Sequence, residues 1–205
     1  MTMQVKWWQF FSAALLVLSA HVYAQETPVS IVSATSEAVR AELVKENGSN
    51  TDAVRAEVEK LVHPRFDFAR MTALAVGKYW RTATPEQKAA LSEEFRTLLT
   101  RTYYTTMLRY RNVKVNISPD TILENDGKQA TVKTTVDMSA GQQPVKIDYV
   151  LYNTDKGWLV FNVVVEGASL VTVYRNQFAD EVNKGGIAGL IQSLHNKNAQ
   201  PAQQS

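Results

Sequence analysis

The residues that could carry acid–base chemistry are few and scattered. Beyond the first 24 residues the histidines are His63, which stands beside Pro64 at an expected helix end, and His195, close to the end of the chain. These positions favour a capping or surface role for both. The adjacent pair Glu93 and Glu94 falls on an exposed helical face, which is typical of a solvated surface rather than of two carboxylates sharing a proton.

Motifs for nucleophilic or cofactor chemistry are missing as well. Ser169 stands in the sequence Gly-Ala-Ser-Leu-Val (167–171), which lacks the second glycine of a nucleophile elbow. The sequence holds no glycine loop for phosphates and no dinucleotide fingerprint. With no cysteine, it can form no disulfide, thiolate nucleophile or cysteine metal site. We therefore expect no catalysis, no metal and no cofactor.

The charge balance excludes another class of partner. The formal net charge is +2, and residues of both signs are scattered along the chain. A nucleic-acid binder normally carries a basic stripe, so nucleic acid is not an expected partner.

The N-terminus has the pattern of a secretory signal. Lys6 gives a positive start, residues 10–18 form an apolar run too short to span a bilayer, and residues 22–24 (Val-Tyr-Ala) offer a cleavage site. We expect residues 1–24 to be cleaved and residues 25–205 to form a single domain. Export without cysteines fits a bacterial periplasm.

The first half of the mature chain has helical periodicity. Helices are expected over 28–46 and from about 51 to 62, and a short one after Asp67 that ends before Gly77. Thr84-Pro85-Glu86-Gln87 is a strong helix start, with a capping hydroxyl, proline at the first helical position and glutamine three residues after the cap. The long helix that follows carries an apolar stripe: Leu91, Phe95, Leu98, Leu99, Thr102, Tyr103 and Met107.

The second half changes to the alternating pattern of strands. Residues 129–138 and 143–153 alternate, 158–165 is apolar on nearly both faces, and 113–117 adds a candidate edge strand. Helical periodicity returns after Gly167, breaks at 185–186 and ends in a polar tail, expected to be disordered from about 197. The prediction is an α+β fold: a curved four-stranded antiparallel sheet packed against several helices, an NTF2-like cavity with helical additions.

The sequence also contains many tyrosines. Such residues can line a cavity with the ring inside and the hydroxyl exposed to solvent. A sheet that curls over a long helix encloses either a core filled by side chains or a space open to an apolar ligand. Periodicity alone does not distinguish the two.

A set of motifs in fixed order adds a family resemblance. Together they resemble the MlaC family, the periplasmic phospholipid-binding proteins of the Mla pathway, also called toluene-tolerance auxiliary components, over about 25–197. The motifs lie at 65–68 (Arg-Phe-Asp-Phe), 77–80 (Gly-Lys-Tyr-Trp), 84–87, 102–103, 157–163 (Gly-Trp-Leu-Val-Phe-Asn-Val), 166–171 and 174–178 (Tyr-Arg-Asn-Gln-Phe).

The resemblance implies a phospholipid shuttle and no enzyme. Its expected partners are phospholipid, an inner-membrane ABC transporter with a periplasmic ring of the MCE class, and an outer-membrane lipoprotein–porin complex. Its expected role is maintenance of outer-membrane lipid asymmetry. The alternative is a periplasmic adaptor of a membrane transport complex that carries no lipid of its own.

The candidate lipid-binding residues combine the inward sheet face with the helices expected to face it. A register error of one residue would turn a whole strand's set to the other face. Arg175 can either reach a lipid phosphate at the mouth or pair with a carboxylate such as Glu166. The candidate wall residues are Phe68, Met71, Leu74, Tyr103, Met107, Val132, Val136, Ile147, Tyr149, Leu151, Phe161, Val163, Val165 and Val173.

Overall fold

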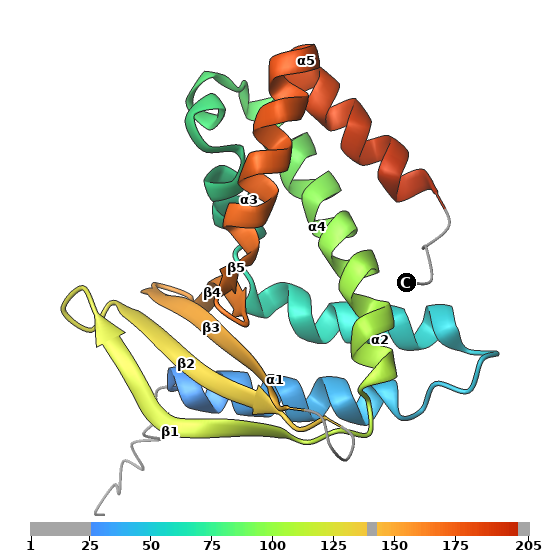
Figure 1. The fold of residues 1–205 in the computed structure, drawn as a ribbon, viewed down its shortest axis with the longest axis vertical. Coiled ribbons are helices and arrows are strands. Elements are labelled where there is room, and N and C mark those ends of the chain that lie inside the picture. Colours follow the sequence, from blue (N-terminus) through green and yellow to red (C-terminus); the bar gives the residue numbers. More distant parts are fainter. Residues whose placement is uncertain (1–25, 139–142, 201–205) are drawn as a thin grey trace, which may run out of the picture.

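The computed structural model describes residues 26–138 and 143–200, so the predicted signal peptide lies outside the described residues. Figure 1 shows α3, α4 and α5 grouped at one end of the molecule and the sheet with α1 at the other. The helices are α1 (Pro28–Leu43), α2 (Thr51–Val62), η1 (His63–Arg65), α3 (Phe68–Val76), η2 (Gly77–Thr82), α4 (Pro85–Arg109) and α5 (Leu170–Ala199); the strands are β1 (Val115–Glu124), β2 (Gln129–Val136), β3 (Val145–Thr154), β4 (Gly157–Val165) and β5 (Ala168–Ser169).

The α+β class is confirmed, but the predicted strand number is wrong. The described residues form one antiparallel sheet of five strands in the order β1-β2-β3-β4-β5. The additional strand, β5, has two residues and pairs with the end of β4. A strand this short leaves no alternating pattern in a sequence. The NTF2-like cavity stays a prediction.

Local capping signals fix where the helices begin. At the start of α4, Thr84 Oγ1 accepts a hydrogen bond from Gln87 N (3.2 Å), and Gln87 Oε1 accepts one from Thr84 N (3.0 Å). This is the predicted capping box. At α3, an Asp67 carboxylate oxygen accepts a hydrogen bond from Arg70 N at 2.8 Å. Both caps satisfy backbone donors that have no partner within the helix.

The sheet register decides which side chains share a face. Val132 pairs with Tyr149, and Tyr149 in turn pairs with Val163. Between the pairs Val150–Asn162 and Leu151–Val160 the register shifts, so Phe161 is an extra residue in β4. This bulge breaks the simple alternation along β4.

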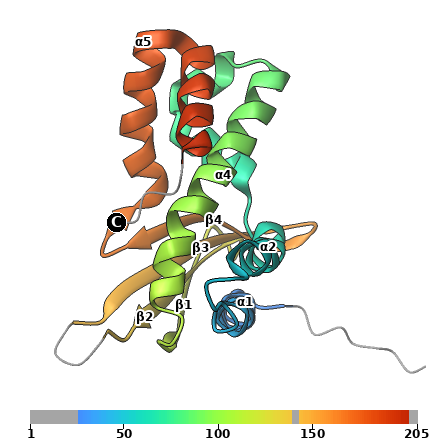
Figure 2. The same ribbon diagram turned by 90° about the vertical axis from the view of Figure 1, so that its right-hand side faces the viewer.

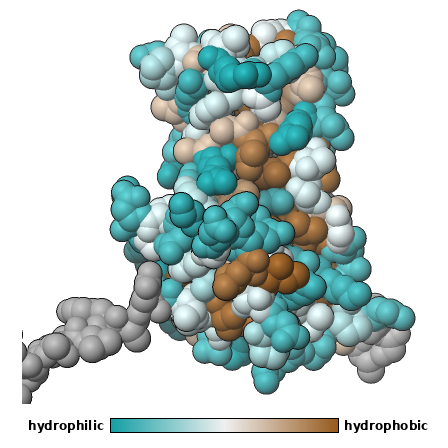
Figure 3. All heavy atoms as spheres, turned by 90° about the vertical axis from the view of Figure 1, so that its left-hand side faces the viewer, coloured by the Kyte–Doolittle hydropathy of each residue, from teal (hydrophilic) through white to brown (hydrophobic). Residues whose placement is uncertain are grey.

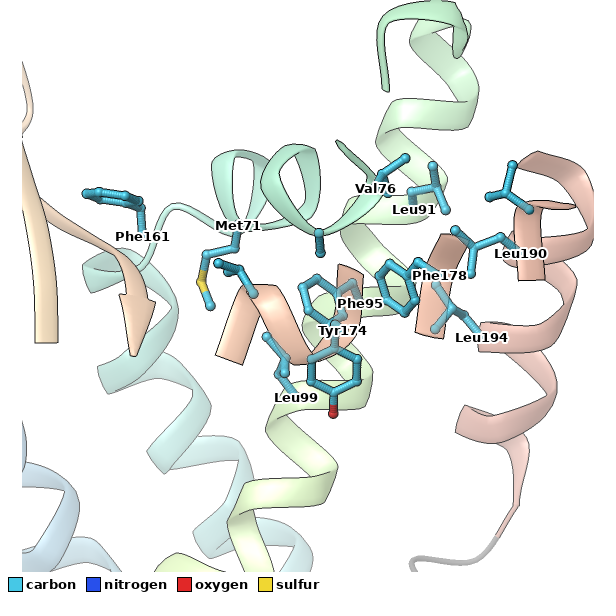
Figure 4. Packing of buried hydrophobic residues seen from close by; sticks show 13 residues of the cluster. Met71, Val76, Leu91, Phe95, Leu99, Phe161, Tyr174, Phe178, Leu190 and Leu194 are labelled. Atoms are coloured by element: carbon cyan, nitrogen blue, oxygen red, sulfur yellow. The ribbon is translucent and has the colours of Figure 1, made fainter. Parts of the chain in front are cut away.

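The largest core cluster lies among the helices. Phe95 of α4 packs against Tyr174 and Phe178 of α5, with ring centroids 4.9 and 5.1 Å apart. Figure 4 shows these rings between the two helices, with Met71 on one side and Leu190 on the other. The cluster is filled by side chains, as expected of a close-packed interior.

Helix α5 folds back on itself at Gly186. The sequence predicted a break at 185–186, and Gly186 has φ 66° and ψ −171°, which only glycine adopts without strain. Beyond the kink the helix lies beside α4, where Asn198 Nδ2 donates to the carbonyl of Glu94 at 2.9 Å (Figure 2). The helix continues through Ala199, whereas the polar tail was expected from about 197. Packing on α4 holds these polar residues in the helix.

Candidate functional site: the borders of three core clusters

The buried hydrophobic side chains form three separate clusters rather than one core. The first joins α3, α4 and α5, the second joins α1 to the sheet, and the third joins α1, α2 and the second half of α4. A domain of this size usually has one contiguous core. In the described part of the chain α4 packs on α3 and α5 but makes no extended backbone contact with any strand. The clusters border one another along α4, α1 and the sheet.

Half-buried apolar residues line the borders between the clusters. Tyr149 and Val163 lie at the edge of the sheet cluster, Met107 at the edge of the α1–α2–α4 cluster, and Tyr103 at the edge of the helical cluster. Each contacts a core but keeps accessible surface. We call Tyr103, Met107, Ile147, Tyr149, Val163 and Val165 the interior set.

Tyr149 shows the character of this region most clearly. Its side chain is only half-buried, yet burial raises the pKa of its phenol. Its ring is thus surrounded by protein while part of the side chain keeps accessible surface. Burial also raises the pKa of Tyr103. It raises the pKa of Tyr174 to about 12, and the proximity of Tyr103 contributes to that shift.

The register brings much of the predicted sheet face together. Ile147 pairs with Val165, and Tyr149 pairs with Val163, so these four side chains share one face of the sheet. Val132, Val136 and Leu151 belong to the same face, since β2 and β3 pair without a shift. Val136 is half-buried at one end, whereas Val132 and Leu151 are fully buried in the core under α1.

Four other predicted wall residues lie elsewhere. Met71 is buried within the helical cluster, and Leu74 lies at that cluster's edge. Phe161 is turned to the opposite face by the bulge, where its ring packs edge-on against Tyr152 at 5.6 Å. Val173 is 45% exposed on α5, so it lines no interior here. The periodicity of the sequence identified these residues as apolar. It could not predict the bulge in β4 or which face of α5 is exposed to solvent.

Arg175, the predicted headgroup residue, is hydrogen-bonded to the end of α3. Its Nε donates to the carbonyl of Leu74 at 2.8 Å, near the end of α3. Its side chain also lies against Gly77, where an added Cβ would stand 3.8 Å from the arginine. Glu166, the alternative partner, accepts a hydrogen bond from Lys146 N instead. The contacts favour a structural role in which Arg175 joins α5 to α3.

The sequence analysis did not include two half-buried apolar residues of α2 among the candidates. Leu61 and Val62 are half-buried and pack at the edge of the third cluster, together with Met107 and Leu108. Their position on the apolar face of α2, after the buried Val54 and Val58, was the available signal. Ile117 of β1 borders the sheet cluster in the same way.

The opposite face of the sheet is closed by polar and aromatic contacts with α3. The Tyr152 hydroxyl donates to the carboxylate of Asp67, and the Arg70 guanidinium lies 4.0 Å from the Tyr152 ring centroid and 4.2 Å from that of Phe161. Burial, together with the hydrogen bond to Asp67, raises the pKa of Tyr152. These contacts hold α3 against the sheet.

An outer hollow of about 660 Å³ lies between the first half of α4 and the β3–β4 hairpin. Its lining is largely polar, and Phe68 is the one predicted wall residue in it. This hollow is therefore distinct from the interior set. Figure 3 shows another face of the molecule, on which hydrophobic surface forms a band between hydrophilic regions.

Two further features are absent from the described ranges, 26–138 and 143–200. No group of three or more potential metal-binding side chains occurs there. No helix in these ranges is long and apolar enough to cross a membrane.

Comparison with known proteins agrees with this architecture. The family model described as MlaC protein matches residues 33–196. The toluene tolerance protein ttg2D of Pseudomonas putida is 29% identical over 167 residues, covering 80% of this chain and 76% of that protein. The intermembrane phospholipid transport system binding protein MlaC of Haemophilus influenzae is 23% identical over 62% of this chain and 59% of its own length.

A solved structure shares the fold. The phospholipid-binding protein of Ralstonia solanacearum, solved in complex with a phospholipid, superposes with a TM-score of 0.78 at 34% sequence identity, over 87% of this chain and all of that one. The family match spans most of the chain, and the structural relative agrees with it. This chain belongs to the MlaC family.

Proposed function

We propose that this protein is a phospholipid carrier that holds acyl chains in the interior between its three core clusters. The observation that carries the proposal is the interior set, whose apolar side chains keep accessible surface at the borders of the core clusters and on the shared sheet face. The phospholipid complex of the Ralstonia solanacearum relative and the name of the Haemophilus influenzae relative support the same ligand class.

The energetics of lipid transfer suit such an interior. Each methylene group left in water costs about 0.8 kcal/mol, so two chains of about sixteen carbons would cost on the order of 25 kcal/mol if exposed. A carrier must cover nearly all of that surface. It need not bind the chains more tightly than a bilayer does, because both surroundings are apolar. Transfer in either direction can then be nearly balanced, and the partners set its direction.

The proposed cellular role follows the family. We infer that residues 1–24 are removed on export, and that residues 25–205 act as one lipid-binding domain in the periplasm. There the protein exchanges lipid with an outer-membrane lipoprotein–porin complex and with an inner-membrane ABC transporter that has an MCE-class ring. The consequence would be maintained lipid asymmetry of the outer membrane, without an enzymatic step.

Lipid extraction from the purified mature protein, followed by a transfer assay between labelled and unlabelled vesicles, tests this function. A carrier co-purifies with phospholipid and accelerates transfer in proportion to its concentration. An adaptor without cargo would contain no extractable lipid and would leave the vesicle-to-vesicle rate unchanged.

A further inference from the structure

The outer hollow beside α4 has the volume of a ligand site. Its volume of about 660 Å³ lies within the range of small-molecule sites, which is roughly 300–1,000 Å³. One wall is α4, with Ala89, Ser92, Glu93 and Arg96, and the other is the β3–β4 hairpin over 153–156. Phe66 and Phe68 add a stacked aromatic surface, with ring centroids 5.8 Å apart.

Some polar groups in the hollow are already used by the fold. Asp67 accepts hydrogen bonds from Arg70 N and from the Tyr152 hydroxyl. Ser92 Oγ donates to the carbonyl of Lys88 at 2.8 Å, and Thr154 Oγ1 donates to that of Gly157 at 2.7 Å. The hydroxyl protons of Ser92 and Thr154 and one acceptor site on each Asp67 oxygen are therefore used by the fold.

Other groups have capacity left. Within the described residues, the side chains of Asn153, Asp155 and Lys156 form no hydrogen bond and no ion pair, although all three line the hollow. On the facing wall, Arg96 uses Nη2 for Glu93 and keeps its remaining N–H donors. The hollow thus has one cation on each wall with N–H donors to spare: Lys156 on the hairpin and Arg96 on α4.

The balance of these charges selects the ligand. Arg96 and Lys156 supply two positive charges, and Asp67, Glu93 and Asp155 supply three negative charges, although Asp67 already accepts the Tyr152 hydroxyl. Two cations from separate walls suit a phosphate group, which accepts charge-assisted hydrogen bonds. The carboxylates would repel a simple anion but suit an attached ammonium group. The aromatic surface and Leu159 offer contact for a short carbon skeleton.

We propose that the hollow is a second binding site, separate from the apolar interior, for a zwitterionic phosphodiester of the phosphoethanolamine type. Arg96 and Lys156 hold the phosphate, and Asp155 holds the ammonium. Two sources share this chemistry: a free glycerophosphodiester in solution and the headgroup of a lipid in a membrane.

The test is a binding titration of the full mature protein with glycerophosphoethanolamine, followed by NMR or calorimetry. The wild-type protein should bind saturably, and Lys156→Ala should weaken binding about tenfold, the effect of one charge-assisted hydrogen bond. Lys114→Ala, at an exposed lysine outside the hollow, is the matched control and should bind as the wild type does. Absence of saturable binding, or an unchanged affinity in Lys156→Ala, would overturn the proposal.

Two further arms sharpen the assignment. Asp155→Asn should weaken binding of glycerophosphoethanolamine but not that of glycerol 3-phosphate, which has no ammonium group; equal loss for both ligands would contradict the assigned orientation. Co-sedimentation with vesicles of phosphatidylethanolamine distinguishes the sources. If the wild-type protein sediments with the vesicles and Lys156→Ala does not, the site binds the headgroup of a lipid in a membrane. Ile147→Trp, which obstructs the proposed interior, should leave the titration unchanged. A failure of the second site can therefore be told apart from a failure of the proposed carrier function.

Discussion

Tyr149 and Tyr152 lie three residues apart on β3 and face opposite sides of the sheet. The Tyr152 hydroxyl donates to the Asp67 carboxylate, whereas that of Tyr149 forms no hydrogen bond within the described residues. One side of the sheet is thus closed by a specific polar contact with α3. On the other side, burial raises the pKa of the Tyr149 phenol, and no hydrogen bond among the described residues holds its hydroxyl.

Removing each hydroxyl should therefore have different effects on stability. Tyr152→Phe leaves the Asp67 carboxylate without one of its donors, and we expect it to lower the free energy of unfolding by about 1–2 kcal/mol. Tyr149→Phe removes no hydrogen bond and should change that free energy by less than about 0.5 kcal/mol. Urea titrations of both variants provide the measurement. Equal losses would contradict the contrast between the two faces.

The helical cluster should be the most sensitive part of the core. Phe95→Ala removes a fully buried ring that contacts Tyr174 and Phe178, and we expect a loss of about 3–5 kcal/mol in the free energy of unfolding. Val173→Ala, at an exposed position on α5, should cost less than about 0.5 kcal/mol. Denaturant unfolding of the two variants checks both values, and a small loss for Phe95→Ala would show a loosely packed cluster.

The kink in α5 should tolerate a side chain at one glycine and not at its neighbour. Gly186 adopts φ 66° and ψ −171°, so Gly186→Ala should destabilise the protein by about 1–3 kcal/mol through backbone strain. Gly185 lies in ordinary helical backbone with open space around it, and Gly185→Ala should stabilise by about 0.4–1 kcal/mol. Thermal unfolding of the pair gives opposite shifts in Tm if the kink is native.

Alkaline pH should weaken the fold through Tyr174. Its folded-state pKa of about 12 exceeds the ordinary tyrosine pKa of 10.0, so the unfolded chain loses its proton first as pH rises. The stabilisation from the neutral phenol is complete below pH 10 and is lost between pH 10 and about 12. Its upper limit is about 2–3 kcal/mol. Tyr174→Phe should flatten the decline of the unfolding free energy over this range, and an unchanged slope would contradict the assignment.

The sequence predicted the helices more fully than the arrangement of the site. Capping residues such as Thr84 and Asp67 act within one helical turn, so local patterns reveal them. The shared face of Ile147 and Tyr149 also followed from simple alternation. The bulge at Phe161 depends on pairing with β3, and the use of Arg175 depends on where α3 ends against α5. Such tertiary effects leave no periodic signal in a single sequence.

The central claim, that acyl chains occupy the interior, is tested most directly by native mass spectrometry of two neighbouring tryptophan variants. Ile147 lies in the interior set, while Lys146 is exposed and points to the opposite face of β3. We expect phospholipid adducts on the wild-type protein and on Lys146→Trp, and their loss from Ile147→Trp, with unchanged circular dichroism in all three. Bound phospholipid retained in Ile147→Trp at the wild-type level would contradict the account.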